Sequence, residues 1–159
     1  MAQTLTRSLT DLGALLHLVD PTLPIGGFNH SNGLETFVQQ GVVESKTTLE
    51  EYVQTQLLQN WIYNDGAYLS LAFDAMNEGN FDRLCELDWQ LSATKMARES
   101  REGSFKLGVR LLKIFIRYET HTLLTAYQQA IAEKRVQGYF PIVFAMVAQA
   151  MGLTKADTL

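Results

Sequence analysis

The chain is 159 residues long, 47% hydrophobic and 19% charged, with a formal net charge of −4. This composition argues against a disordered chain, and no apolar run approaches the roughly 20 residues that span a bilayer, so no membrane partner is expected. The acidic balance also argues against nucleic acid as a partner, because a phosphate-binding surface needs a basic excess.

Apolar residues recur at helical spacing along nearly the whole chain, and no alternating pattern predicts a strand. The sequence therefore predicts an all-α fold, a compact bundle of about seven helices with short loops in one domain over residues 1–159. The predicted helices begin with residues 9–19 and 31–40, followed by one that opens at Thr47 and breaks or kinks at Asp65 and Gly66, and by a further helix over 67–76. The next helix spans 81–92, a stretch over 95–100 leads past Gly103 and Gly108 into 109–118, and the last two helices span 121–134 and 139–151.

Several boundaries of these helices have recognisable signals. Ser31 or Asn32 is expected to cap the second helix, and Gly41 to end it in a left-handed conformation. Thr47 opens the third, with Glu50 three residues on in a capping-box pattern. These residues fix where the expected loops begin and end.

The core is expected to include apolar residues of the helix over 81–92. The candidates are Leu84, Leu87, Trp89 and Leu91, and Cys85 is interpreted as a small buried hydrophobe beside them. As the one cysteine, Cys85 has no partner for an internal disulfide. Since no signal peptide is recognisable either, we expect a cytoplasmic protein in a reducing compartment.

Two helices, over residues 109–118 and 139–151, are apolar nearly all round. Such a helix is either central in its bundle or covered by a second copy of the chain. After the second of them, Thr154 and Asp157 have the spacing of a further helix start, which the chain ends too soon to complete. We therefore expect the chain to be truncated at its C-terminal end.

Motifs for catalysis or metal binding are not found. There is no glycine-rich phosphate loop and no G-x-S-x-G, and His17, His30 and His121 show no ligand spacing. The expected catalytic, cofactor and metal residues are therefore none. The densest basic stretch, laced with Glu99 and Glu102, suits a solvated helix face; it comprises Lys95, Arg98, Arg101, Lys106 and Arg110.

The segment over residues 23–35, LPIGGFNHSNGLE, predicts a well-ordered loop entering a helix. Leu23 and Ile25 can anchor the loop while Pro24 stiffens it. Gly26 and Gly27 permit unusual backbone angles or a close approach. Taken alone, the segment indicates a structural role.

Three blocks of the sequence, taken together, are a more specific signature of a protein family than any one of them alone. The first is LPIG at 23–26 with Phe28, HS at 30–31 and GLE at 33–35, preceded by L-x-D at 18–20. The second is ARESREGS at 97–104 followed by LGVRLL at 107–112, and the third is FPIVF at 140–144 followed by GL at 152–153. In these blocks the chain resembles the urease accessory protein family UreF. Three positions depart from the family pattern: Tyr139 stands where a histidine is common, and Asn29 and Asn32 replace a serine and an aromatic residue.

The resemblance implies a non-enzymatic adaptor that joins the D/H-type urease accessory protein and the GTPase UreG to load nickel into apo-urease. It also implies a homodimer. Nickel and GTP would act in the assembled complex, with no cofactor bound firmly by this chain. The candidate partner-binding residues are Leu23, Pro24, Ile25, Gly26, Gly27, Phe28, His30, Ser31 and Glu35.

Two other functions stay open at this point. One is a stand-alone nickel-binding metallochaperone, because imidazole suits nickel and His30 lies in a polar turn. The less favoured one is a helical hydrolase with His30 and Glu35 as an acid–base pair, although no nucleophile or metal completes that set.

Overall fold

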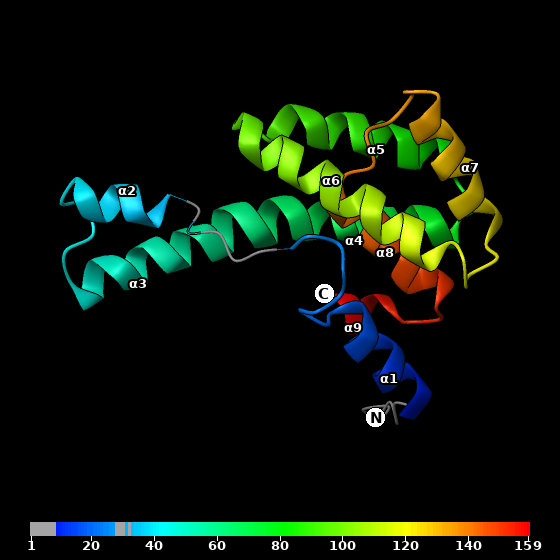
Figure 1. Cartoon of the computed structure of the whole chain (residues 1–159), viewed down its shortest axis with the longest axis horizontal. Coiled ribbons are helices and arrows are strands. Elements are labelled where there is room, and N and C mark those ends of the chain that lie inside the picture. The colour runs from blue at the N-terminus through cyan, green and yellow to red at the C-terminus, as the bar shows by residue number, and fades with distance from the viewer. Residues whose placement is uncertain (1–8, 28–30, 32) are drawn as a thin grey trace. The chain divides into compact units, whose positions relative to one another are not determined.

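The computed structural model describes residues 9–27, 31 and 33–159, and within these ranges it contains helices and turns but no strand (Figure 1). The predicted all-α fold is confirmed. The helices of the described residues are α1 (Leu9–Leu18), α2 (Leu34–Gln39), α3 (Lys46–Thr55), the π-helix η1 (Gln56–Gly66), α4 (Ala67–Asn77), α5 (Phe81–Thr94), α6 (Arg98–Phe115), α7 (Thr122–Ala132), α8 (Phe140–Ala150) and α9 (Lys155–Thr158).

The described residues fall into two units. One unit comprises residues up to 27 and from 68 onward, with α1 and α4 to α9, and the other comprises residues between 28 and 67, with α2, α3 and η1. The single domain expected over residues 1–159 stays a prediction.

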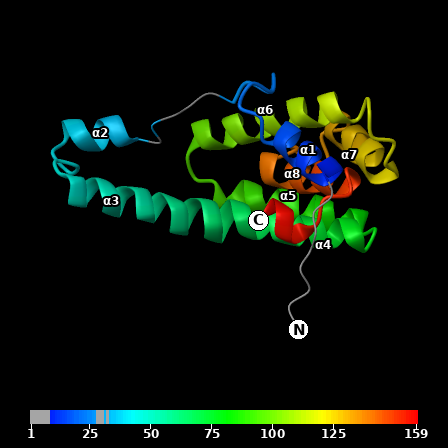
Figure 2. The ribbon, with the colours of Figure 1, turned by 90° about the horizontal axis from the view of Figure 1, so that it is seen from below.

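Helix α8 is central in the first unit. It lies between α6 and α5 (Figure 2), and its residues from Pro141 to Ala148 are all buried. Pro141 fits the first turn because the backbone N–H that proline lacks has no partner inside the helix there. Of the two expected explanations for this apolar helix, the central position is confirmed, since the chain's own helices cover it.

At Gly108, the backbone of α6 packs directly against the backbone at the start of α8. A Cβ on Gly108 would meet the carbonyl oxygen of Gly138, and it would lie 2.9 Å from the nitrogen of Phe140. The expected helix start at residue 109 is wrong, because α6 already begins at Arg98 and runs through Gly103 and Gly108. The close packing at Gly108 offsets the usual cost of glycine inside a helix.

Helix α5 supplies three fully buried leucines, Leu84, Leu87 and Leu91, as predicted. Trp89 was expected beside them, and that expectation is wrong: its side chain is 56% exposed. Its indole Nε1 donates a 2.8 Å hydrogen bond to the carbonyl of Arg135, so the ring lies at the surface against the α7–α8 loop. Cys85 is partly buried against the core, and burial raises the pKa of its thiol.

In the second unit the helix caps differ from the expected ones. The N-cap of α2 is Gly33, in a left-handed conformation (φ 94°), and not Ser31; Asn32, the other expected cap, lies outside the described residues. The cap of α3 is Ser45, whose hydroxyl accepts from the Thr48 nitrogen while the Thr48 hydroxyl accepts from the Ser45 nitrogen. The capping box therefore lies two residues before the predicted one. Gly41 does adopt the predicted left-handed conformation (φ 70°).

The chain is not broken at Asp65 and Gly66, where a break or kink was predicted. The backbone stays right-handed helical at Thr55 and at Ala67, and between them the chain forms the eleven-residue π-helix η1. Wider turns thus accommodate the residues that were expected to interrupt the helix.

At the C-terminal end the predicted helix start is confirmed and the helix does form. Thr154 and Asp157 make a reciprocal capping box over the four residues of α9. Lys155 adds a 2.7 Å ion pair to Asp74, which joins α9 to α4.

Candidate functional site

The loop that follows α1 belongs to the first unit as far as Gly27. Asp20 stands at its beginning, and its carboxylate accepts hydrogen bonds from the hydroxyl and from the backbone nitrogen of Thr22. These hydrogen bonds, the one from the hydroxyl first, lower the pKa of Asp20. Leu23 and Ile25 are partly buried against the core, as their anchoring role predicts, while Pro24 is exposed. The loop is therefore pinned by two side chains and presents the proline.

Arg110 of α6 fixes the backbone of this loop. Its Nη1 donates a 3.1 Å hydrogen bond to the carbonyl of Ile25. Gly26 follows with φ 79°, and a Cβ there would collide with the Arg110 guanidinium. Gly27 lies against Leu107 of the same helix. Both glycines therefore allow the close approach expected of them, and Gly26 also has the unusual backbone angle.

Replacing Arg110 by alanine is expected to loosen the loop with little change in global stability. One surface hydrogen bond contributes about 1 kcal/mol, far below the stability of a domain. Hydrogen exchange should therefore speed up at the amides of Leu23 and Ile25, which donate within the loop. The matched control is Lys106→Ala on the same helix, which should leave these amides unchanged. Equal exchange in both variants would contradict the role given to Arg110.

The other candidate partner-binding residues lie beyond this loop in the chain. Phe28 and His30 lie outside the described residues, so the pairing of His30 with Glu35 stays an untested expectation. Ser31 and Glu35 belong to the second unit. The carbonyl of Ser31 accepts a 3.0 Å hydrogen bond from the Tyr52 hydroxyl, and Glu35 is exposed on α2.

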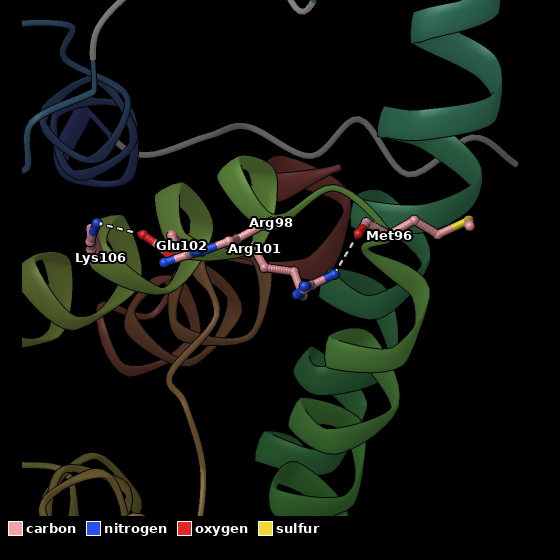
Figure 3. Close-up of polar contacts among 5 residues, drawn as sticks. All are labelled: Met96, Arg98, Arg101, Glu102 and Lys106. Carbon is pink, nitrogen blue, oxygen red and sulfur yellow. Dashed lines mark hydrogen bonds and ion pairs between the residues drawn. The ribbon is translucent and has the colours of Figure 1, made fainter.

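The beginning of α6 has a polar arrangement of its own, shown in Figure 3. Glu102 forms ion pairs with Arg98 at 2.7 Å and with Lys106 at 3.2 Å, one turn to either side. These partners, Arg98 first, lower the pKa of Glu102. Arg101 donates to the carbonyls of Lys95 and Met96, at 2.6 and 2.5 Å, and so closes the α5–α6 turn. The solvated face predicted here is confirmed for Arg98 and Lys106, whereas Lys95 is buried.

A buried carboxylate that the sequence analysis missed joins α5 to the α7–α8 loop. Asp88 is fully buried, and its oxygens accept from the backbone nitrogens of Gln137, Gly138 and Tyr139 at 2.7 to 3.0 Å. The Tyr127 hydroxyl donates a fourth hydrogen bond at 2.7 Å. The spacing of Asp88 from Leu84, Leu87 and Leu91 was a signal, because it puts an acidic residue on the core face of α5.

Across the part of the chain that the structure describes, no three His, Cys, Asp or Glu side chains are grouped to hold a metal ion. Likewise, none of the described helices is both long and apolar enough to cross a membrane. What the described residues do provide is a loop with a fixed backbone on α6 and, in the second unit, helices with many exposed apolar side chains.

Comparison with known proteins places these features in a family. The family model described as UreF matches residues 43–159, which include the second and third sequence blocks but not the loop. A urease accessory protein UreF of Haemophilus influenzae (strain PittEE) is 98% identical over all 159 residues, which make up 68% of that protein. Those of Actinobacillus pleuropneumoniae serotype 5b and Lachnoclostridium phytofermentans are 80% and 36% identical, over 93% and 91% of this chain and 65% and 64% of their own lengths.

An all-helical chain with relatives of this description falls in the class of urease accessory proteins. Within that class, the chain belongs to the UreF family. The resemblance inferred from the three sequence blocks is therefore confirmed.

Proposed function

We propose that this chain is a non-enzymatic adaptor of urease maturation. It joins the D/H-type urease accessory protein and the GTPase UreG, and the assembly, with the adaptor as a homodimer in the cytoplasm, loads nickel into apo-urease. Nickel is the cargo of this process, and GTP is used by the partner. The observation that carries the proposal is membership of the UreF family over nearly three quarters of the chain.

The surface of the second unit supports an adaptor role. Its helices bury little of their apolar surface, and exposed apolar patches mark sites of protein–protein contact. The exposed apolar residues include Phe37, Val38, Val42, Leu49, Val53, Leu57, Leu58, Trp61, Ile62 and Tyr63. Tyr63 is 70% exposed and Ile62 53%.

Co-expression with the D/H-type accessory protein tests the proposal. The chain is expected to co-purify with that protein, and Ile62→Asp is expected to weaken the complex at least about tenfold, since it places a charge on an apolar contact face. The matched control is Gln54→Asp, an exposed polar position on α3, which should bind as the parent does.

The longer Haemophilus influenzae relative serves as the positive control. Capture of that relative but not of this chain would contradict the adaptor role for these 159 residues. Tight stoichiometric nickel binding by the isolated chain in equilibrium dialysis would instead favour the metallochaperone.

A further inference from the structure

Helix α6 has a row of cations on its outer surface that the proposed function does not use. Lys106, Arg110 and Lys113 lie on the helix, and Arg117 follows in the turn after it. All four side chains are exposed. We call these four residues the α6 basic row.

The row lies on the side of α6 that faces away from the core. Successive helical residues are about 100° apart, so Lys106, Arg110 and Lys113 fall within about 60° of one another. The buried residues of the same helix, Gly108, Leu111, Leu112 and Phe115, are centred on the opposite side. Packing against α8 therefore orients the row outward.

The row has no acidic residue inside it. Residues 103–118 contain no Asp or Glu, although the chain as a whole has a net charge of −4. Acidic residues occur only at the two ends, at Glu102, which pairs with Lys106, and at Glu119. Among the residues that the structure describes, Lys113 and Arg117 form no ion pair.

The row is held in place by its surroundings. Arg110 binds the Ile25 carbonyl through one guanidinium N–H, and the other N–H donors of a guanidinium can bind a second acceptor. On the buried side of α6, the backbone at Gly108 packs directly against the backbone at Gly138. A preorganised cationic surface of this kind loses little conformational entropy when a partner binds.

We propose that the α6 basic row is a docking surface for an acidic segment of another protein. The fitting segment has carboxylates repeated over about 15 Å, the length of the row at 1.5 Å per residue. Such a partner meets the row with complementary charge, and the guanidinium of Arg110 suits a carboxylate. A protein segment is favoured over nucleic acid because Glu102 and Glu119 bound the row at both ends. A short acidic segment fits between them, whereas the continuous charge of a phosphate backbone extends past them and is repelled.

The probe is a fluorescent Ala-rich peptide with Glu at every third or fourth position, compared with the same peptide carrying Gln. Anisotropy with the whole chain is expected to show binding of the Glu peptide alone, weakening as salt rises from about 50 to 300 mM. Lys113→Glu with Arg117→Glu should weaken it at least about tenfold. The control, Lys46→Glu with Lys134→Glu, adds the same negative charge elsewhere and should bind as the parent does.

Three results overturn the proposal: equal binding of the Glu and Gln peptides, equal loss in both double variants, or preferential binding of a single-stranded oligonucleotide of matched charge. Cations near a helix C-terminus also stabilise its dipole, so the melting temperature of each variant is measured alongside. If the double reversal does not fold, Lys113→Gln with Arg117→Gln replaces it. The peptide assay needs no urease component, so its outcome is independent of the proposed adaptor role.

Discussion

Replacing Asp88 by alanine is expected to lower the free energy of unfolding by about 3–5 kcal/mol, a large part of the stability of a domain this size. The carboxylate accepts from three backbone N–H groups and from the Tyr127 hydroxyl in a water-excluded site. Without it these donors are buried with no acceptor, and each unsatisfied donor costs about 1–3 kcal/mol unless the loop moves. Urea unfolding followed by far-ultraviolet circular dichroism measures the loss.

Asp82→Ala is the matched control on the same helix. Asp82 is exposed in the first turn of α5, and its favourable interaction with the helix dipole is worth less than about 1 kcal/mol. If both alanine variants lost equally little stability, the Asp88 network would have no structural importance.

Tyr127→Phe removes a single donor from the network and is expected to cost about 1 kcal/mol, so it stays measurable if Asp88→Ala does not fold. It also gives a pH test. Burial first, and then Asp88, raise the pKa of Tyr127 well above its ordinary value of 10.0. The unfolded chain therefore releases this proton first, so the stability from Tyr127 is complete below pH 10 and is lost as pH rises above it. The parent should lose stability more steeply than Tyr127→Phe in that range.

Replacing Gly108 by valine is expected to destabilise the first unit by about 3 kcal/mol or more. A Cβ at this position meets backbone atoms only: the Gly138 oxygen, the Phe140 nitrogen and the Tyr139 carbonyl carbon. Backbone cannot rotate away as a flexible side chain does, so α6 has to separate from the start of α8. The melting temperature and the urea midpoint should both fall.

Gly103→Ala replaces a glycine one and a half turns earlier on the same helix. A Cβ there has nothing within 4 Å, so the alanine should stabilise α6 by about 0.5–1 kcal/mol through its better helix propensity. Opposite signs at the two glycines are the expected result. Stabilisation at both would show that the contact at Gly108 is not tight.

Most of the fold could be predicted from the sequence because helical periodicity depends on which residues are buried. The positions of α1, α7 and α8 and the buried Leu84, Leu87 and Leu91 followed from that pattern. The exposure of Trp89 could not be predicted in this way, because a periodicity argument counts tryptophan as an apolar residue and ignores its indole N–H. The indole N–H instead binds the Arg135 carbonyl at the surface.

Glycine was the other main source of error. Gly103 and Gly108 indicated a break, but both lie inside α6, where packing on α8 outweighs local propensity. Gly66 likewise ends a π-helix without interrupting the helical backbone, and Gly33 rather than Ser31 caps α2. In each case tertiary packing or backbone conformation decided the structure, and neither can be predicted from the helix preference of a single residue.

For the candidate site, the sequence indicated the loop and its anchors but not what holds it. Leu23, Ile25, Gly26 and Gly27 lie as expected, yet the Arg110 hydrogen bond joins residues 85 positions apart in the sequence. The Asp88 network could not be predicted for the same reason, because its carboxylate oxygens accept hydrogen bonds from loop nitrogens about 50 positions away. Contacts of this range follow from the fold and not from local pattern.

The placement of the two tryptophans gives each unit its own optical reporter. Trp61 lies in η1 and Trp89 in α5, and the chain has no third tryptophan. Removing one leaves a fluorophore whose emission reports on a single unit: Trp89 senses the α7–α8 loop through its hydrogen bond to Arg135, and the 48% exposed Trp61 senses whatever covers the second unit. A blue shift confined to Trp61 on mixing with a partner would assign the contact to η1 without a crystal of the complex.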